Sequence, residues 1–94
     1  MDTNTKKSVG DCHTTISGDV IYLGDFGGLA TYIFQSDGAL LFCDIDTKLK
    51  PLCTVPLDYV RDNQHRSWET PIGGYVFGPE VSAKIIELAE QYTT

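Results

Sequence analysis

The stretch VIYLGDFGGLATYIFQSDGALLFCDI, residues 20–45, decides the fold of this chain. Two runs within it, residues 20–23 and 29–34, are rich in the β-branched and aromatic side chains that favour strands. A third apolar run spans residues 39–45. The glycine-rich residues 24–28 separate the first two runs, and Asp37-Gly38, a strong signal for a two-residue hairpin turn, precedes the third. The stretch therefore predicts a three-stranded antiparallel meander over residues 19–46.

The same turn predicts the register of the strands. A two-residue loop pairs Phe34 with Leu41 and, further along, Tyr32 with Cys43 and Ala30 with Ile45. These side chains share one face with Val20 and Tyr22. The other face carries Ile21, Leu23, Leu29, Ile33, Leu40 and Phe42. Both faces are apolar, whereas a half-buried sheet alternates apolar and polar residues, so the pattern predicts a cover on each side.

One cover is visible in the sequence, a helix over residues 79–92. Pro79 suits a first helical position, and Glu80 lies where the helix dipole favours an anion. An apolar stripe at helical spacing follows, made of Val81, Ile85, Leu88, Ala89 and Tyr92. No comparable segment exists for the opposite sheet face. We expect an α+β fold, in which an antiparallel sheet of four to five strands packs on this helix.

The rest of the chain is less regular. Residues 53–59 alternate apolar and polar side chains as a strand does, and Pro51 and Pro56 would confine such a strand to the edge of a sheet. Alternatively, Pro56 begins a short helix through Val60. Residues 61–71 are polar and predict a loop with Trp68 as its one large apolar residue. A short last strand is expected at residues 75–77. We expect residues 1–12 to form a flexible tail and residues 13–94 a single domain.

Composition narrows the class of protein. The net charge of −6 disfavours nucleic acid as a partner, because phosphate binding needs clusters of lysine and arginine. No apolar run approaches the ~20 residues of a membrane span, and the N-terminus lacks the apolar segment of a secretory signal, so we expect a cytoplasmic protein. Its three cysteines form no Cys-x-x-Cys pair, and Cys43 is expected to be a buried free thiol.

Two short motifs resemble catalytic loops. Asp44-Ile45-Asp46 after an apolar strand resembles the nucleophile loop of haloacid-dehalogenase-type phosphatases, but Thr47-Lys48 stand where that family has glycine and threonine. Asp25-Phe26-Gly27 resembles the metal-binding loop of protein kinases, whose glycine-rich loop and catalytic loop have no counterpart here. We interpret the first motif as the hydrophilic end of a strand and the second as the bend of a hairpin. We expect no catalysis, no cofactor and no metal site, since the cysteines and histidines lack paired spacing.

A weak candidate ligand site remains. Residues 65–69 gather a histidine, an arginine, a tryptophan and a glutamate, types enriched at binding hot spots. A pocket between sheet, helix and the 61–71 loop would be lined by His65, Arg66, Trp68, Tyr32 and Tyr75. The alternative is a purely structural role, in which Trp68 anchors the loop on the core.

Three functions follow from these expectations. The first is a small acidic interaction or regulatory protein that forms a homodimer through an uncovered apolar face, with Ile21, Leu23, Ile33, Leu40 and Phe42 as candidate interface residues. The second is an immunity- or inhibitor-type protein for a basic partner protein, since acidity speeds such association. The third is a small-molecule-binding protein that uses the pocket near the 61–71 loop.

Overall fold

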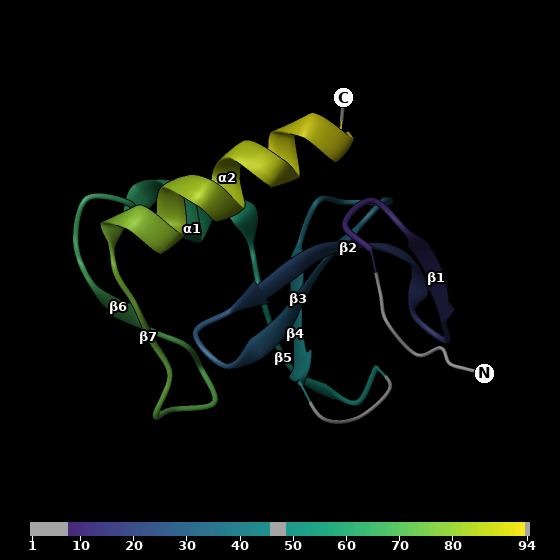
Figure 1. Ribbon diagram of the computed structural model, residues 1–94, viewed down its shortest axis with the longest axis horizontal. Coiled ribbons are helices and arrows are strands. Elements are labelled where there is room, and N and C mark those ends of the chain that lie inside the picture. Colours follow the sequence, from purple (N-terminus) through teal and green to yellow (C-terminus); the bar gives the residue numbers. More distant parts are fainter. Residues whose placement is uncertain (1–7, 46–48, 94) are drawn as a thin grey trace.

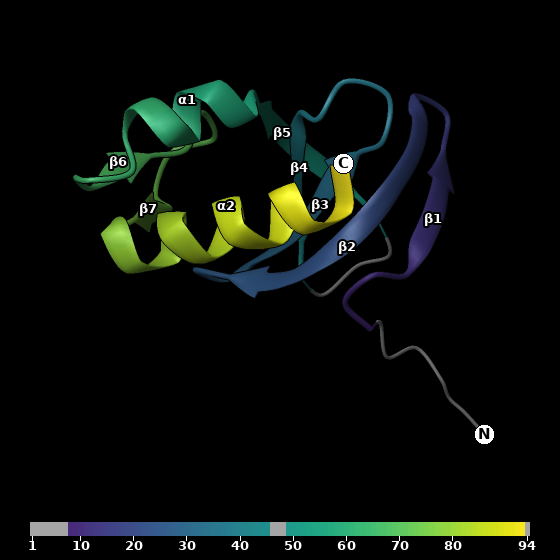
Figure 2. The same cartoon turned by 90° about the horizontal axis from the view of Figure 1, so that it is seen from above.

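The computed structural model describes residues 8–45 and 49–93. Five strands form an antiparallel meander in chain order: β1 (Cys12–Thr15), β2 (Gly18–Phe26), β3 (Leu29–Phe34), β4 (Leu40–Asp44) and β5 (Pro51–Val55). The remaining elements are α1 (Leu57–Asp62), the hairpin β6 (Trp68–Glu69) and β7 (Val76–Phe77), and α2 (Pro79–Thr93). Helix α2 lies across one face of the sheet with α1 beside it (Figures 1 and 2). The predicted α+β class is confirmed.

Helix α2 has the predicted start and the predicted apolar stripe. It begins at Pro79, and Ile85 and Ala89 are buried in the core between helix and sheet. Val81, Leu88 and Tyr92 pack against the same core. The helix therefore forms because its 3.6-residue period presents one apolar stripe to the sheet. On its outer face Lys84 pairs with Glu87, at 3.6 Å.

The β2–β3 connection is a tight two-residue turn. Phe26 pairs with Leu29, so Gly27 and Gly28 alone form the loop, both with positive φ as a type I′ turn requires. A Cβ on Gly27 would overlap the ring of Phe77, so this turn lies directly on the core. Asp25-Phe26-Gly27 is thus the end of a strand and the first half of a hairpin turn.

The β3–β4 connection is longer than predicted, which corrects the register. Residues 35–38 form a four-residue loop, in which the Phe34 N–H donates to the Ala39 carbonyl at 2.8 Å. Tyr32 consequently faces Leu41, and Ala30 faces Cys43. The predicted pairing is wrong by two residues, an even number, so every side chain keeps its predicted face. The prediction that Ile45 pairs with Ala30 is also wrong, because Ile45 follows the end of β4 and is 41% exposed.

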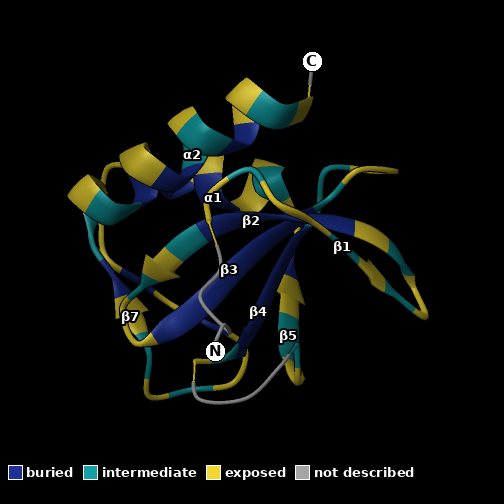
Figure 3. Cartoon of the chain, turned by 45° about the vertical axis from the view of Figure 1, so that its right-hand side comes forward, coloured by how far each residue is buried: buried dark blue, intermediate teal, exposed yellow. Residues whose placement is uncertain are grey.

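Both faces of the sheet are buried in one chain, as the dark centre of Figure 3 shows. We call the first core cluster the helix-side cluster; its residues on the five-stranded sheet are Ile21, Leu23, Leu29, Ile33, Leu40, Phe42 and Val55. We call the second the tyrosine-side cluster; it consists of Val20, Tyr22, Ala30, Tyr32, Leu41 and Cys43, which are only 0–7% exposed. Phe34 and Leu49 pack against it, and His13 on β1 meets the Tyr32 ring edge-on. The expectation of an uncovered second face is corrected, because the chain buries that face itself.

The segment that the sequence left ambiguous contains both expected elements. Residues 51–55 form an edge strand, and Pro56, in an extended conformation, precedes the short helix α1. The short late strand is present but pairs with Trp68–Glu69 in a separate hairpin rather than with the main sheet. Upstream of β1, the Gly10 N–H donates to the Tyr22 carbonyl. Within residues 8–45 and 49–93, no helix is both long and apolar enough to cross a membrane.

Candidate functional site

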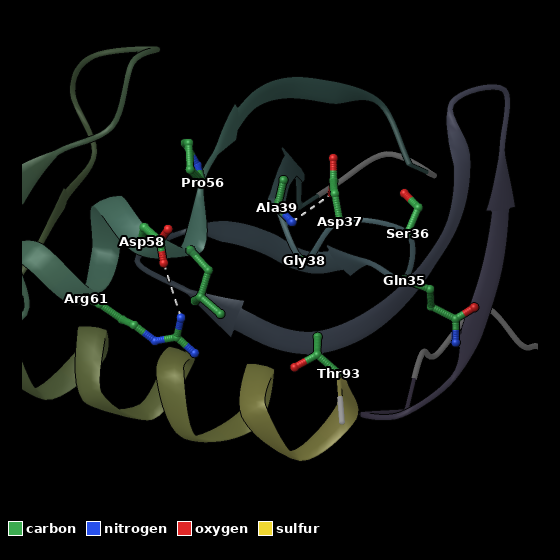
Figure 4. A pocket seen from close by; sticks show the side chains of 10 residues that line it. Gln35, Ser36, Asp37, Gly38, Ala39, Pro56, Asp58, Arg61 and Thr93 are labelled. Atoms are coloured by element: carbon green, nitrogen blue, oxygen red, sulfur yellow. Dashed lines mark hydrogen bonds and ion pairs between the residues drawn. The ribbon is translucent and has the colours of Figure 1, made fainter.

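A cavity opens where three distant segments meet. It has a volume of about 520 Å³ and is lined by residues 35–39, residues 56–58, Arg61 and Thr93 (Figure 4). The pairing of Leu40 with Val55 brings the β3–β4 loop beside Pro56 at the start of α1. Thr93, near the end of α2, completes the wall. We call this cavity the polar cleft.

The loop that forms one wall of the polar cleft is held by its own hydrogen bonds. The Asp37 carboxylate accepts a hydrogen bond from the Ala39 N–H at 3.0 Å, and the Gly38 N–H donates to the Phe34 carbonyl at 3.0 Å. Gly38 has a φ of 76°, a left-handed conformation that glycine adopts at little cost. Asp37 is therefore fixed at the rim of the cleft and not free to turn away.

The opposite wall carries a small network of ion pairs. The Arg61 guanidinium contacts the Asp58 carboxylate at 3.3 Å and the Glu90 carboxylate at 3.2 Å, which joins α1 to α2. All three side chains are well exposed, so the network adds little to stability. Among the residues that line the cleft, Asp37 and Asp58 are acidic and Arg61 is basic, which gives a local net charge of −1. The cleft is thus electrostatically suited to a cation.

A second, smaller cavity lies on the other side of Pro56. Its volume is about 250 Å³, and we call it the apolar cavity because most of its wall is apolar. The lining residues are Thr54, Val55, Pro56, Tyr59, Glu69 and Pro71. Tyr59 is 45% exposed, and its ring meets Trp68 edge-on at 5.5 Å between centroids.

The five residues of the predicted ligand site do not line one pocket. Trp68 is buried in the helix-side core, where its indole N–H donates to Ser82 Oγ at 2.8 Å, and Tyr75 packs against the same core. Tyr32 lies on the opposite face of the sheet. Arg66 donates two hydrogen bonds to Asn63 Oδ1, at 2.9 and 2.7 Å, and His65 is exposed. Trp68 therefore anchors its loop on the core.

The five predicted interface residues lie beneath α2. They are between 0 and 6% exposed and belong to the helix-side cluster: Ile21, Leu23, Ile33, Leu40 and Phe42. A second copy could reach them only if α2 left the sheet. The structure therefore assigns these side chains to the core of a single chain instead of a surface between copies.

Asp25 and Asp44, which belong to the two catalytic-looking motifs, do not line the cleft. Asp25 Oδ1 accepts a hydrogen bond from the Tyr22 hydroxyl at 2.6 Å. Burial raises the pKa of Tyr22, and this hydrogen bond raises it further. Asp44 ends β4, and Asp46 lies outside the described residues. In the part of the chain that the structure describes, no three His, Cys, Asp or Glu side chains are grouped as metal ligands would be.

Two buried polar atoms in or beside the tyrosine-side cluster lack hydrogen-bond partners among the described residues. They are the hydroxyl of Tyr32, a residue with no exposed surface, and Nε2 of His13. Burial raises the pKa of Tyr32, and the neighbouring Cys43 thiol contributes to this shift. Cys43 is buried and forms no disulfide, as predicted. On the other face, burial raises the pKa of the half-buried Cys53 thiol.

Comparison with known proteins adds no guide to function, since no family model, curated protein or solved structure matches this chain. Sequence reasoning missed the residues of the polar cleft, above all Asp37, Asp58 and Arg61. Asp37 and Asp58 are far apart in sequence and become neighbours of one cavity only through the pairing of β4 with β5. One sequence signal could have found this cavity. The alternation of residues 53–59 predicts a strand, and pairing that strand with residues 40–44 would have brought Pro56 close to the loop that contains Asp37.

Proposed function

We propose that this chain is a non-catalytic interaction protein that binds a positively charged group of a basic partner protein in the polar cleft. The observation that carries the proposal is the excess of carboxylates over guanidinium at a cavity of about 520 Å³. An immunity- or inhibitor-type role is one form that such binding takes. The net charge of −6 supports it, because an acidic protein attracts a basic partner over distance and speeds their encounter.

The character of the cleft favours a protein partner over a small molecule. Its volume falls within the range of ligand pockets, about 300–1,000 Å³, but such pockets are mostly apolar and enclose their ligand. This cleft is open, and its polar border consists of two carboxylates, two hydroxyls, an amide and the Arg61 guanidinium. Such a wall suits a hydrated ammonium or guanidinium group that stays attached to a larger molecule.

The proposal is tested with a fluorescein-labelled pentapeptide, GKGKG, and its acidic counterpart, GEGEG. Binding is measured by fluorescence anisotropy at about 20 mM and about 300 mM salt, since screening weakens exposed ion pairs. We expect GKGKG to bind at low salt and to weaken at high salt, and GEGEG not to bind. Preference for GEGEG would overturn the proposal and would point to Arg61 as the binding group.

Matched variants distinguish the cleft from general acidity. Asp37→Asn with Asp58→Asn removes two charges at the cleft, and the asparagine at 37 keeps an oxygen for the Ala39 N–H. Glu80→Gln with Glu87→Gln removes two charges from α2, far from Thr93 along the helix. Losing two exposed ion pairs of about 0.5 kcal/mol each lowers affinity about fivefold. We expect that loss for the cleft pair alone; equal losses for both pairs would contradict the proposal.

A further inference from the structure

The polar cleft and the apolar cavity share one wall. Pro56 lines both, with Leu57 and Asp58 on the side of the cleft and Val55 and Tyr59 on the side of the apolar cavity. Asp58 and Tyr59 are consecutive residues in the first turn of α1, so their side chains diverge by about 100°. Pro56 and the first turn of α1 thus separate the negatively charged polar cleft from the apolar cavity.

The two hollows differ in the chemistry that each can recognise. Carboxylates border the polar cleft, whereas a proline on either side and the Tyr59 ring surround much of the apolar cavity. The Tyr59 ring is supported from behind by Trp68, which Ser82 holds by a buried hydrogen bond. The apolar cavity therefore has a firm wall, able to take a side chain without collapsing.

We infer that the two hollows together bind one extended segment of the partner, with a lysine or arginine in the polar cleft and a large aliphatic side chain in the apolar cavity. This inference rests on the proposed function and adds to it the sequence character of the partner. Neighbouring residues of an extended chain point to opposite sides. Residues two positions apart lie on the same side of such a chain, so we expect this spacing for two hollows that share Pro56 as a wall.

Four peptides test the two parts of this inference by fluorescence anisotropy. GKGLG carries both groups at the expected spacing, GKGSG lacks the apolar side chain, GKLGG places the two groups at adjacent positions, and GEGLG reverses the charge. We expect GKGLG to bind about tenfold more tightly than GKGSG, a gain of about 1.4 kcal/mol from a partly enclosed leucine. We expect GKLGG to resemble GKGSG. Equal binding of GKLGG and GKGLG would overturn the spacing.

Variants at Tyr59 show where the leucine binds. Tyr59→Ala removes the ring from the wall of the apolar cavity, and Tyr59→Phe keeps it. We expect the tenfold preference for GKGLG over GKGSG to fall below twofold in Tyr59→Ala and to persist in Tyr59→Phe. Thermal melting of each variant confirms that it is folded at the assay temperature. A preference that persists in folded Tyr59→Ala would overturn the inference.

The two proposals fail in different ways. If GKGLG and GKGSG bind alike, but both weaken in the variant with Asp37→Asn and Asp58→Asn, the polar cleft binds a cation and only the apolar part is refuted. If that variant binds every peptide as the unmodified chain does, both proposals are refuted. Tight binding of GEGLG would likewise refute both.

Discussion

Two tyrosines on the same face of the sheet are buried in different chemical surroundings. Tyr22 donates its hydroxyl hydrogen to Asp25, at 2.6 Å, close to the protein surface. The hydroxyl of Tyr32 has no hydrogen-bond partner among the described residues, although the residue has no exposed surface. A buried polar group without a partner costs free energy, whereas a hydrogen bond to a charged acceptor is among the stronger ones.

Phenylalanine substitutions at the two positions should therefore have opposite effects on the free energy of unfolding. We expect Tyr22→Phe to destabilise the chain by about 1–2 kcal/mol, because it removes a hydrogen bond to a carboxylate. Tyr32→Phe keeps the ring and removes only the unpaired hydroxyl, so we expect no loss and a gain of up to about 1 kcal/mol. Urea denaturation followed by circular dichroism measures both. A loss above about 1 kcal/mol in Tyr32→Phe would show that its hydroxyl is paired.

At the scale of elements, the β2–β3 and β3–β4 hairpins show how far local sequence signals predict a turn. Asp-Gly is a strong signal for a two-residue turn, yet Asp37-Gly38 forms half of a four-residue loop. The Asp37 side chain bonds the Ala39 N–H, which stabilises the longer loop. Gly27-Gly28 forms the two-residue turn instead. The three central strands could be predicted from the sequence, but their register depended on a side-chain hydrogen bond.

The two turns differ in what surrounds their glycines. Alanine substitutions at Gly27 and Gly38 should therefore lower the free energy of unfolding by different amounts. Both Gly27 and Gly38 have positive φ, so each substitution strains the backbone by about 1–2 kcal/mol. A Cβ at Gly38 meets nothing nearby, whereas one at Gly27 overlaps the Phe77 ring in the core. We therefore expect Gly27→Ala to cost about 1–3 kcal/mol more than Gly38→Ala in denaturant unfolding. Equal costs would contradict the packing of the β2–β3 turn on Phe77.

The β6–β7 hairpin is tied to α2 through one buried hydrogen bond, from the Trp68 indole N–H to Ser82 Oγ. Ser82→Ala leaves the indole N–H unpaired, and Trp68→Phe leaves the buried hydroxyl unpaired. We expect each to cost about 1–3 kcal/mol or more, the second also through lost packing. The double variant leaves neither group unpaired, so we expect its cost to be smaller than the sum of the two. Strict additivity in urea denaturation would contradict the bond.

At the scale of the whole molecule, the sequence predicted the class of fold and the face on which the residues of the three central strands lie. Those features follow from periods of 2 and 3.6 residues, which are local. The closure of the second sheet face, the separate β6–β7 hairpin and the polar cleft were not predictable in this way. Each depends on contacts between distant residues, such as Leu40 with Val55 and His13 with Tyr32.

The closure of both faces changes what we expect of self-association. The predicted homodimer depended on an uncovered apolar face, and the residues proposed for it are in the core. Large apolar side chains that are exposed in the described residues lie on loops, at strand edges or beside the apolar cavity: Val9, Ile16, Ile45, Tyr59, Ile72 and Val76. We expect sedimentation velocity at about 50 µM to give the mass of one chain. The mass of a dimer would contradict this expectation.

The account depends most on where a partner segment binds. The most direct test is an NMR titration of the ¹⁵N-labelled chain with GKGLG, which locates the binding surface residue by residue. We predict that the largest amide shifts occur in residues 35–39 and 54–61, and that both groups respond at the same peptide concentration because one segment fills both hollows. Largest shifts on the outer face of α2, around Lys84, or on β1 would contradict the account.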